Sequence, residues 1–160
     1  MPAPTVITVT VSDTRTTADD ASGAALKEEL AAFTLVRHVI VPDRADAILA
    51  VLADAQRASI DALVFTGGTG IAPRDVTYEA IAGKLDKTLD GFGEAFRRLS
   101  WDEIGPRAIL SRATAGTLGG MLVFLLPGST KAARLGAREL IAPILAHAVD
   151  LVHGRTHHKG

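Results

Sequence analysis

Short runs rich in β-branched residues alternate with segments of helical periodicity along most of this 160-residue chain. The expected strands are Thr5 to Val11, Leu35 to Val41, a run containing Leu63 to Phe65, and Met121 to Leu126. Such alternation is typical of a doubly wound α/β domain. Aromatic residues make up only 4% of the chain, so aliphatic side chains must build the core, as in parallel sheets covered on both faces. The sequence predicts a three-layer α/β/α sandwich with a mainly parallel central sheet.

Helical spacing of apolar residues fills the intervals between these strands. The expected helices cover residues 21–32, 45–57, 76–83 and 91–104. A long final helix should begin after Ser129, whose hydroxyl can cap it, and continue to about Val152. Pro143 should kink or break that helix. We expect one domain over residues 1–154, followed by a polar tail at 155–160.

Composition and charge exclude several classes of protein. The formal net charge is −1, and acidic and basic residues are intermixed, so nothing indicates a nucleic-acid or anionic-membrane partner. The chain has no Cys, which excludes disulfides, thiolate zinc sites and a cysteine nucleophile. The N-terminal sequence does not have the pattern of a signal peptide, and no apolar run approaches the roughly 20 residues that span a bilayer. We therefore expect a cytoplasmic protein.

Three of the expected strands end in small, hydroxyl-rich or glycine-rich sequences. The first is followed by Ser12-Asp13-Thr14, the third ends at Thr66 before Gly67-Gly68-Thr69-Gly70, and the last is followed by Pro127-Gly128-Ser129-Thr130-Lys131. Open α/β sheets bind ligands outside the carboxyl ends of their strands. Glycines let backbone N–H groups approach a ligand, and helix N-termini favour anions. The three loops together predict a site for a phosphate-bearing ligand, although each alone could be a structural turn. Neither a P-loop nor a GxGxxG fingerprint is present.

Two carboxylates are expected beside these loops. Asp43 follows the second strand, and Asp75 follows the glycine loop. Paired carboxylates beside phosphates commonly hold Mg²⁺, which prefers oxygen ligands. The spacing leaves open a simpler interpretation, in which Asp43 closes a turn and Asp75 caps a helix.

Other polar residues are weaker candidates. Arg74, Lys131 and Arg134 could pair with phosphates. The cluster formed by Asp19, Asp20, Ser22 and Gly23 could cap the first helix or order the loop over the ligand. The histidines are scattered, and His157-His158 in the tail have no evident third metal ligand. The aromatic residues Phe92, Phe96 and Trp101 are expected in the core or at a subunit contact.

Five runs resemble the MoaB/Mog family of molybdopterin-binding proteins. They are SDTRTTADDASG (12–23), TGGTGIAPRDVTYEAI (66–81), GFGEAFRRLSWDEIG (91–105), AILSRATAG (108–116) and LPGSTKAAR (126–134). The single-domain layout is closest to the MoaB branch of that family. The resemblance implies a molybdopterin-binding α/β fold, assembled as a homotrimer or hexamer, that acts in molybdenum cofactor biosynthesis with a downstream molybdenum-insertion partner.

The resemblance also implies a reaction and its residues. In catalytic members the terminal phosphate of molybdopterin attacks the α-phosphate of Mg-ATP, which gives adenylyl-molybdopterin and pyrophosphate. Asp43 and Asp75 match the family's catalytic aspartates and would hold Mg²⁺. The loop Thr66, Gly67, Gly68, Thr69 and Gly70 matches the ligand loop, with further binding residues at Ser12, Asp13, Gly128, Ser129 and Lys131.

Two positions depart from the family pattern. Tyr78 replaces a proline in the motif RDVTPEA, which we expect to cost rigidity rather than a ligand contact. Arg44 stands where many catalytic members have an acidic residue after Asp43. Two alternatives to an adenylyltransferase therefore stay open: a carrier or scaffold that binds molybdopterin without adenylylating it, and a related domain with a different pterin- or nucleotide-linked task.

Overall fold

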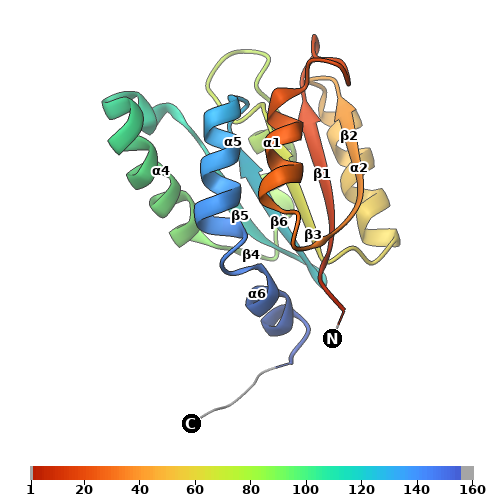
Figure 1. The fold of residues 1–160 in the computed structure, drawn as a ribbon. Coiled ribbons are helices and arrows are strands. Elements are labelled where there is room, and N and C mark those ends of the chain that lie inside the picture. Colours follow the sequence, from red (N-terminus) through yellow and green to blue (C-terminus); the bar gives the residue numbers. More distant parts are fainter. Residues whose placement is uncertain (1, 156–160) are drawn as a thin grey trace.

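The computed structural model describes residues 2–155, and within that part of the chain six strands form one sheet in the order β2-β1-β3-β6-β5-β4 (Figure 1). The strands are β1 Thr5–Val11, β2 Thr34–Val41, β3 Ala62–Thr66, β4 Lys87–Thr88, β5 Thr114–Leu118 and β6 Met121–Leu126. The first three and β6 are parallel, whereas β5 runs antiparallel to β6 and β4 antiparallel to β5. The prediction of a mainly parallel sheet is confirmed.

The helices are α1 Ala21–Glu29, α2 Ala45–Arg57, α3 Thr77–Ile81, α4 Asp90–Ile104, α5 Thr130–Gly136 and α6 Leu145–Val152. Short segments of 3₁₀ helix follow α3 (82–84) and α4 (105–110), and a π-helical segment (137–141) follows α5. None of the helices in residues 2–155 is long and apolar enough to cross a membrane. The tail predicted at 155–160 lies outside the described residues apart from Arg155, whose guanidinium contacts Asp150 at 3.0 Å.

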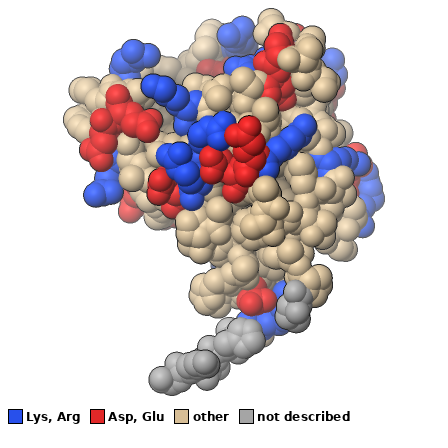
Figure 2. Space-filling model, viewed as in Figure 1, with Lys and Arg blue, Asp and Glu red and all other residues tan. Residues whose placement is uncertain are grey.

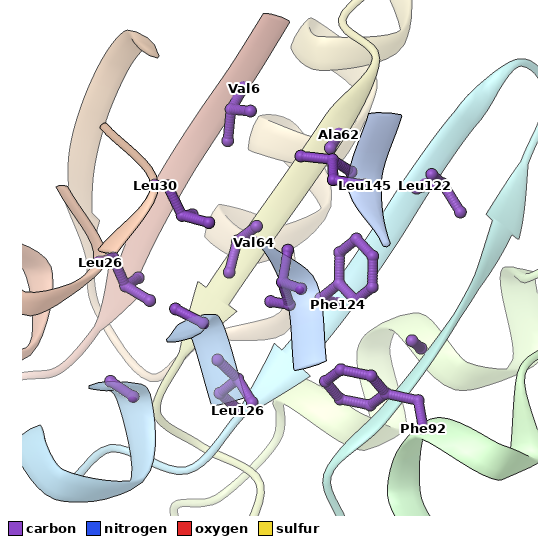
Figure 3. Packing of buried hydrophobic residues seen from close by; sticks show 14 of the residues in the cluster. Val6, Leu26, Leu30, Ala62, Val64, Phe92, Leu122, Phe124, Leu126 and Leu145 are labelled. Carbon is purple, nitrogen blue, oxygen red and sulfur yellow. The ribbon is translucent and has the colours of Figure 1, made fainter. Parts of the chain in front are cut away.

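The core consists of two apolar layers, one on each face of the sheet. Successive side chains of a strand point to opposite faces of the sheet. Val64 of β3 therefore lies in one layer, and its neighbours Leu63 and Phe65 lie in the other. The first layer joins the sheet to α1, α4, α5 and α6; in it the rings of Phe92 and Phe124 pack 5.3 Å apart (Figure 3). The second joins the sheet to α2 and α3. These layers confirm the predicted sandwich.

One helical prediction was wrong in extent. The first helix ends at Glu29 rather than near residue 32, because the chain turns there to enter β2. The final helical segment begins after Ser129 and ends at Val152, as predicted, and it is interrupted: α5 passes into π-helix, and residues 142–144 separate that segment from α6. Pro143 lies in this break, as expected from its missing N–H, and the hydroxyl of Ser129 does cap α5, accepting a hydrogen bond from Ala132 N at 3.2 Å.

The strands β4 and β5 were not predicted. β4 has two residues, and β5 has the sequence TAGTL, whose glycine and alanine favour no extended structure on their own. Pairing with neighbouring strands creates them: Gly116 of β5 lies opposite Val123 of β6, and Thr88 of β4 lies opposite Gly116 of β5.

The carboxyl ends of the four parallel strands meet at the upper edge of the sheet in Figure 1. The order of the strands reverses between β1 and β3, since the chain leaves β1 toward β2 and leaves β3 toward β4, on the other side of the sheet. Open α/β sheets bind their ligands at such a switch point. Figure 2 shows acidic and basic side chains intermixed over the face that α1, α4 and α5 cover, with no field of one sign on that face.

Candidate functional site

A cavity of about 400 Å³ opens at the switch point between β1 and β3. Its walls come from the segments that follow β1, β2, β3 and β6. The structure brings together there most residues that the sequence predicted: Ser12, Asp13, Asp43, Asp75, the segment 66–70 and Gly128. The prediction that three loops share one edge of the sheet is therefore confirmed.

The glycine loop is held in a backbone conformation that other residues rarely adopt. Gly67 has φ +107°, and a Cβ there would lie 2.3 Å from the carbonyl oxygen of Val11. Gly67 N donates to Leu126 O at 2.9 Å, and the Thr77 hydroxyl donates to Gly67 O at 2.9 Å. The hydroxyl of Thr66 donates to Pro127 O at 2.7 Å. The loop is thus fixed between β1 and β6 before any ligand arrives, which is the preorganisation that phosphate binding requires.

Asp13 and Asp43 join the β1 and β2 loops by reciprocal hydrogen bonds. Asp13 N donates to Asp43 Oδ2 at 3.2 Å, and Asp43 N donates to Asp13 Oδ1 at 2.8 Å. Burial and the negative charge of Asp13 raise the pKa of Asp43, with a smaller contribution in the same direction from Asp75, whereas the hydrogen bond from Asp13 N and the charge of Arg74 oppose this rise. Asp43 therefore does not merely close its own turn: it lies where negative charge accumulates.

Asp75 supports the glycine loop from the β3 side. Its Oδ2 accepts a hydrogen bond from Ala72 N at 2.9 Å, and Asp75 N donates to Ala72 O at 2.9 Å. A Cβ on Gly70 would lie 2.7 Å from Asp75 Oδ2, so glycine permits this approach. The alternative in which Asp75 caps a helix is wrong, because Val76 is the N-cap of α3 and no side chain caps that helix.

Asp43 and Asp75, with Asp13 beside Asp43, bring carboxylate oxygens to this cavity, and a hard cation prefers oxygen ligands. In residues 2–155 no three His, Cys, Asp or Glu side chains form a group able to hold a metal ion by themselves. Mg²⁺ is usually held by one or two carboxylates together with substrate phosphates and water. The residues present fit a cation that arrives with a phosphate ligand, and such a cation would relieve the repulsion that raises the pKa of Asp43.

Some predicted site residues lie outside this cavity. Ser129 and Lys131 are exposed at the start of α5 and do not line it. The guanidinium of Arg134 contacts Glu28 at 2.9 Å and Glu29 at 2.8 Å, which fastens α5 to α1 rather than facing a phosphate. Arg74 does line the cavity.

The polar cluster after β1 resolves into separate roles. Asp20 caps α1, accepting a hydrogen bond from Gly23 N at 2.9 Å. The hydroxyl of Ser22 donates to Gly128 O at 2.7 Å and so ties α1 to the opposite wall of the cavity. Asp19 accepts from Thr16 N at 2.6 Å within the intervening loop. The capping alternative is therefore confirmed for Asp20, while Asp19 holds the intervening loop together.

The sequence did not single out three other polar lining residues, Thr10, Arg15 and Ser111. Thr10 lies inside a strand, where a hydroxyl gives no distinguishing signal. Arg15 belongs to an irregular loop. Ser111 follows the 3₁₀ segment after α4 and reaches the cavity because Arg112 N donates to Thr69 O at 3.1 Å. The run AILSRATAG was the signal that could have drawn attention to it.

The sequence of the chain matches proteins of a known family. Residues 7–147 match the family described as "Probable molybdopterin binding domain". The chain is 45% identical over 146 residues to the molybdenum cofactor biosynthesis protein B of Staphylococcus carnosus, covering 88% of this chain and 86% of that protein. The chain belongs to the MoaB family of molybdopterin-binding proteins.

Solved structures of MoaB proteins share its fold. A crystal structure of molybdenum cofactor biosynthesis protein B superposes with a TM-score of 0.89 at 44% identity, covering 95% of this chain and 97% of that one. The molybdopterin biosynthesis enzyme MoaB of Thermus thermophilus superposes with a TM-score of 0.82 at 39% identity, covering 94% and 96%. As a MoaB-family member the chain has a molybdopterin-binding domain and acts in molybdenum cofactor biosynthesis.

Proposed function

We propose that this protein is a molybdopterin adenylyltransferase. An oxygen of the terminal phosphate of molybdopterin attacks the α-phosphorus of ATP. The bond between that phosphorus and the oxygen bridging to the β-phosphate breaks, and pyrophosphate leaves with the electron pair. The products are adenylyl-molybdopterin and pyrophosphate, and the protein forms no covalent intermediate.

The observation that carries this proposal is the meeting of the glycine loop with the carboxylates of Asp13, Asp43 and Asp75 in one cavity. The loop with Gly67 and Gly68 lines the cavity with backbone that carries no side chain, which leaves space for phosphate oxygens. Thr69 has a buried hydroxyl oxygen without a hydrogen-bond partner in the described structure. Buried polar groups are nearly always paired, so this hydroxyl is available to a ligand.

The residues of the cavity would act by positioning and charge. Asp43 and Asp75 would hold Mg²⁺, which when bound neutralises the charge of the ATP phosphates. Arg74 and Arg15, both lining the cavity, would bind phosphate oxygens, and Lys131, which lies in α5 and does not line the cavity, would contribute less. Holding two phosphates in line removes much of the entropic barrier of a bimolecular step.

The alternative function is a carrier that binds molybdopterin without transferring an adenylyl group. One observation favours it: Arg44 pairs with Asp46 of α2 at 2.8 Å, so the position after Asp43 presents no carboxylate to the cavity. Incubation of the protein with molybdopterin and Mg-ATP separates the two functions. Stoichiometric release of pyrophosphate is expected from the adenylyltransferase, and binding without pyrophosphate from the carrier.

We further propose that the protein works in the cytoplasm as a homotrimer or hexamer and passes its product to a molybdenum-insertion protein. Exposed apolar side chains on and after α4, including Trp101, Ile104 and Ile109, offer a surface for subunit contact. Sedimentation equilibrium tests the assembly, since a monomer at micromolar concentration would contradict it.

A further inference from the structure

The loop between β1 and α1, residues 12–20, forms part of the wall of the cavity at the switch point. Its residues 12–15 line that cavity, and residues 16–19 are exposed. Arg15 is its only basic residue, and within residues 2–155 no hydrogen bond or ion pair engages the Arg15 guanidinium. The position of this guanidinium at the cavity therefore depends on how the backbone of the loop is held.

The beginning of the loop is attached to the end of β2. Ser12 N donates to Val41 O at 2.8 Å, and Asp13 and Asp43 exchange the two hydrogen bonds described above. Asp43 is also the carboxylate that we assign to Mg²⁺, so a bound cation would compete with Asp13 N for its oxygens. Only an attachment outside the cavity would hold the loop independently of the ligand.

The end of the loop is held by the buried carboxylate of Asp20, whose side chain is 4% exposed. Thr10, in β1 before the loop, donates its hydroxyl to this carboxylate at 2.8 Å. Gly23 N, in α1 after the loop, donates to it at 2.9 Å. Asp20 does not line the cavity, whereas Thr10 does. The carboxylate therefore joins the strand before the loop to the helix after it and closes the base of the loop.

The imidazole of His38 holds this carboxylate from β2. Its Nε2 lies 2.7 Å from Asp20 Oδ2, and the His38 side chain is 9% exposed. Because an ionised carboxylate can only accept, His38 Nε2 donates this hydrogen bond. The hydroxyl of Thr8, 2.7 Å from His38 Nδ1, fixes the ring on its other side. The loop is therefore attached to β2 and the residues after it twice, at its beginning through Asp43 and at its end through His38.

We infer that His38 is a positioning residue for the binding of Mg-ATP. By holding Asp20 it keeps the base of the loop closed, and the closed loop keeps Arg15 at the cavity. His38 does not line the cavity, so it acts through the loop and not on the ligand. This inference rests on the proposed function for its ligand.

The physical reason is the cost of leaving a buried charge without its donors. Without the imidazole, the Asp20 carboxylate keeps the donors from Thr10 and Gly23 but loses the one from His38. Buried charges that lose a partner gain from contact with water. Asp20 would reach water by moving outward, which opens the base of the loop and lets Arg15 leave the cavity.

The test compares His38→Ala with His38→Gln and with Val149→Ala. Glutamine keeps a side-chain N–H donor for Asp20, so it should restore what alanine loses. Val149 is buried in α6, which lies toward the opposite end of the sheet in Figure 1, and it does not line the cavity. Val149→Ala therefore lowers stability without touching the loop. All variants are compared well below their Tm, with folding checked by circular dichroism.

Two readouts need no turnover. Trypsin cleaves after Arg15, so its rate reports the opening of the loop, and titration calorimetry gives the Kd of Mg-ATP. For His38→Ala we expect cleavage about tenfold faster and a Kd about tenfold higher, the loss of one charged contact. His38→Gln and Val149→Ala should each stay within about threefold of wild type in both.

A double substitution tests whether His38 acts through Arg15. Arg15→Gln alone should raise the Kd of Mg-ATP about tenfold. In the His38→Ala background it should raise the Kd no further, because the contact is already lost. If His38→Ala does not fold, Gly23→Ala takes its place, since its Cβ would lie 2.5 Å from His38 Nε2 and 2.3 Å from Asp20 Oδ2.

Other outcomes overturn the inference. Unchanged cleavage after Arg15 in folded His38→Ala would show that His38 does not hold the loop. Faster cleavage with an unchanged Kd would show that the position of the loop does not govern binding. Equal effects of His38→Ala and Val149→Ala would reduce the role of His38 to general stability. A wild-type protein that binds Mg-ATP but releases no pyrophosphate would instead refute the adenylyl transfer and leave the role of His38 in binding standing.

Discussion

His38 of β2 and Asp20 at the start of α1 lie 2.7 Å apart, Nε2 to Oδ2, with side chains 9% and 4% exposed. Thr10 donates its hydroxyl to the same carboxylate at 2.8 Å, and the Thr8 hydroxyl lies 2.7 Å from His38 Nδ1. Gly23 allows the pair to form, because a Cβ there would lie 2.3 Å from Asp20 Oδ2. This network fixes the far end of the loop that begins at Ser12 in the cavity.

The first prediction concerns the charge of Asp20. Burial opposes that charge, but hydrogen bonds from Gly23, His38 and Thr10 outweigh it and lower the pKa of Asp20. The resulting stability is present above the ordinary carboxyl pKa of about 3.9 and is lost as the pH falls through the lowered value. Asp20→Asn keeps an N-cap acceptor but should reduce the free energy of unfolding at pH 7 by about 2 kcal/mol.

Urea denaturation of the Asp20→Asn variant and of wild type checks this, and the difference between them should shrink below about pH 4. Asp102→Asn, at an exposed position on α4, is the control and should have no effect. A difference that is the same at pH 7 and pH 3 would contradict a role for the carboxylate charge.

A second prediction concerns the shape of the glycine loop. Gly67→Ala would force a side chain into positive φ and against Val11 O. We expect a loss of at least about 2 kcal/mol of unfolding free energy together with the loss of ATP binding. Gly83→Ala is the matched control, because no atom lies within 4 Å of its added Cβ. It should be neutral or stabilise by up to about 1 kcal/mol. Thermal unfolding of both variants measures the difference in their stabilities. Equal stabilities would contradict the prediction that positive φ and the contact with Val11 O require glycine at position 67.

The contribution of Asp43 to stability should depend on pH in the opposite sense to that of Asp20, and it should also depend on Mg²⁺. Its pKa is raised by burial and by Asp13. The stability that its neutral form contributes is present below the ordinary carboxyl pKa and is lost as the pH rises through the raised value. In Mg²⁺-free buffer, Asp43→Asn should therefore gain stability relative to wild type between about pH 4 and pH 7. Millimolar Mg²⁺ with ATP should raise the Tm of wild type more than that of the variant. An equal rise in both would exclude Asp43 as a ligand.

A fourth prediction compares how strongly two cationic residues, Arg74 and Lys131, contribute to ATP binding. Arg74 lines the cavity and Lys131 does not. Arg74→Gln should raise the Kd of ATP about tenfold, since it removes one charged phosphate contact. Lys131→Gln should raise it less than about threefold, by analogy with exposed ion pairs. Titration calorimetry at constant ionic strength measures both, and a larger effect for Lys131 would show that α5 moves over the ligand.

The sequence sufficed for the elements whose own residues determine their structure. β1 and β6 were predicted to the residue because they are dense in β-branched or large apolar side chains, and α2 because its apolar spacing is regular. The carboxyl-edge loops followed from the order of strands and helices. Asp43 and Asp75 needed the family resemblance, since spacing alone allowed a turn or a cap.

What the sequence could not supply depends on contacts between distant segments. Gly116 favours a strand only once β6 lies beside it. His38 has no signal of function in its own strand, because its partner Asp20 comes from another element. Tyr78 was interpreted from its helix position alone, whereas its neighbour Arg112 lies in a distant segment of the chain, beyond α4. Such pairs are visible only in the folded protein.

The most direct test of the account is adenylyl transfer by wild type and by Asp75→Asn. Asparagine retains the oxygen that accepts from Ala72 N, so the loop should persist while the charge is lost. With molybdopterin, Mg²⁺ and ATP labelled at the α-phosphate, wild type should form adenylyl-molybdopterin. The variant should bind molybdopterin normally but form the product at least about a hundredfold more slowly. Equal rates in the two proteins would contradict the role proposed for Asp75. No product from wild type that binds molybdopterin tightly would contradict adenylyl transfer.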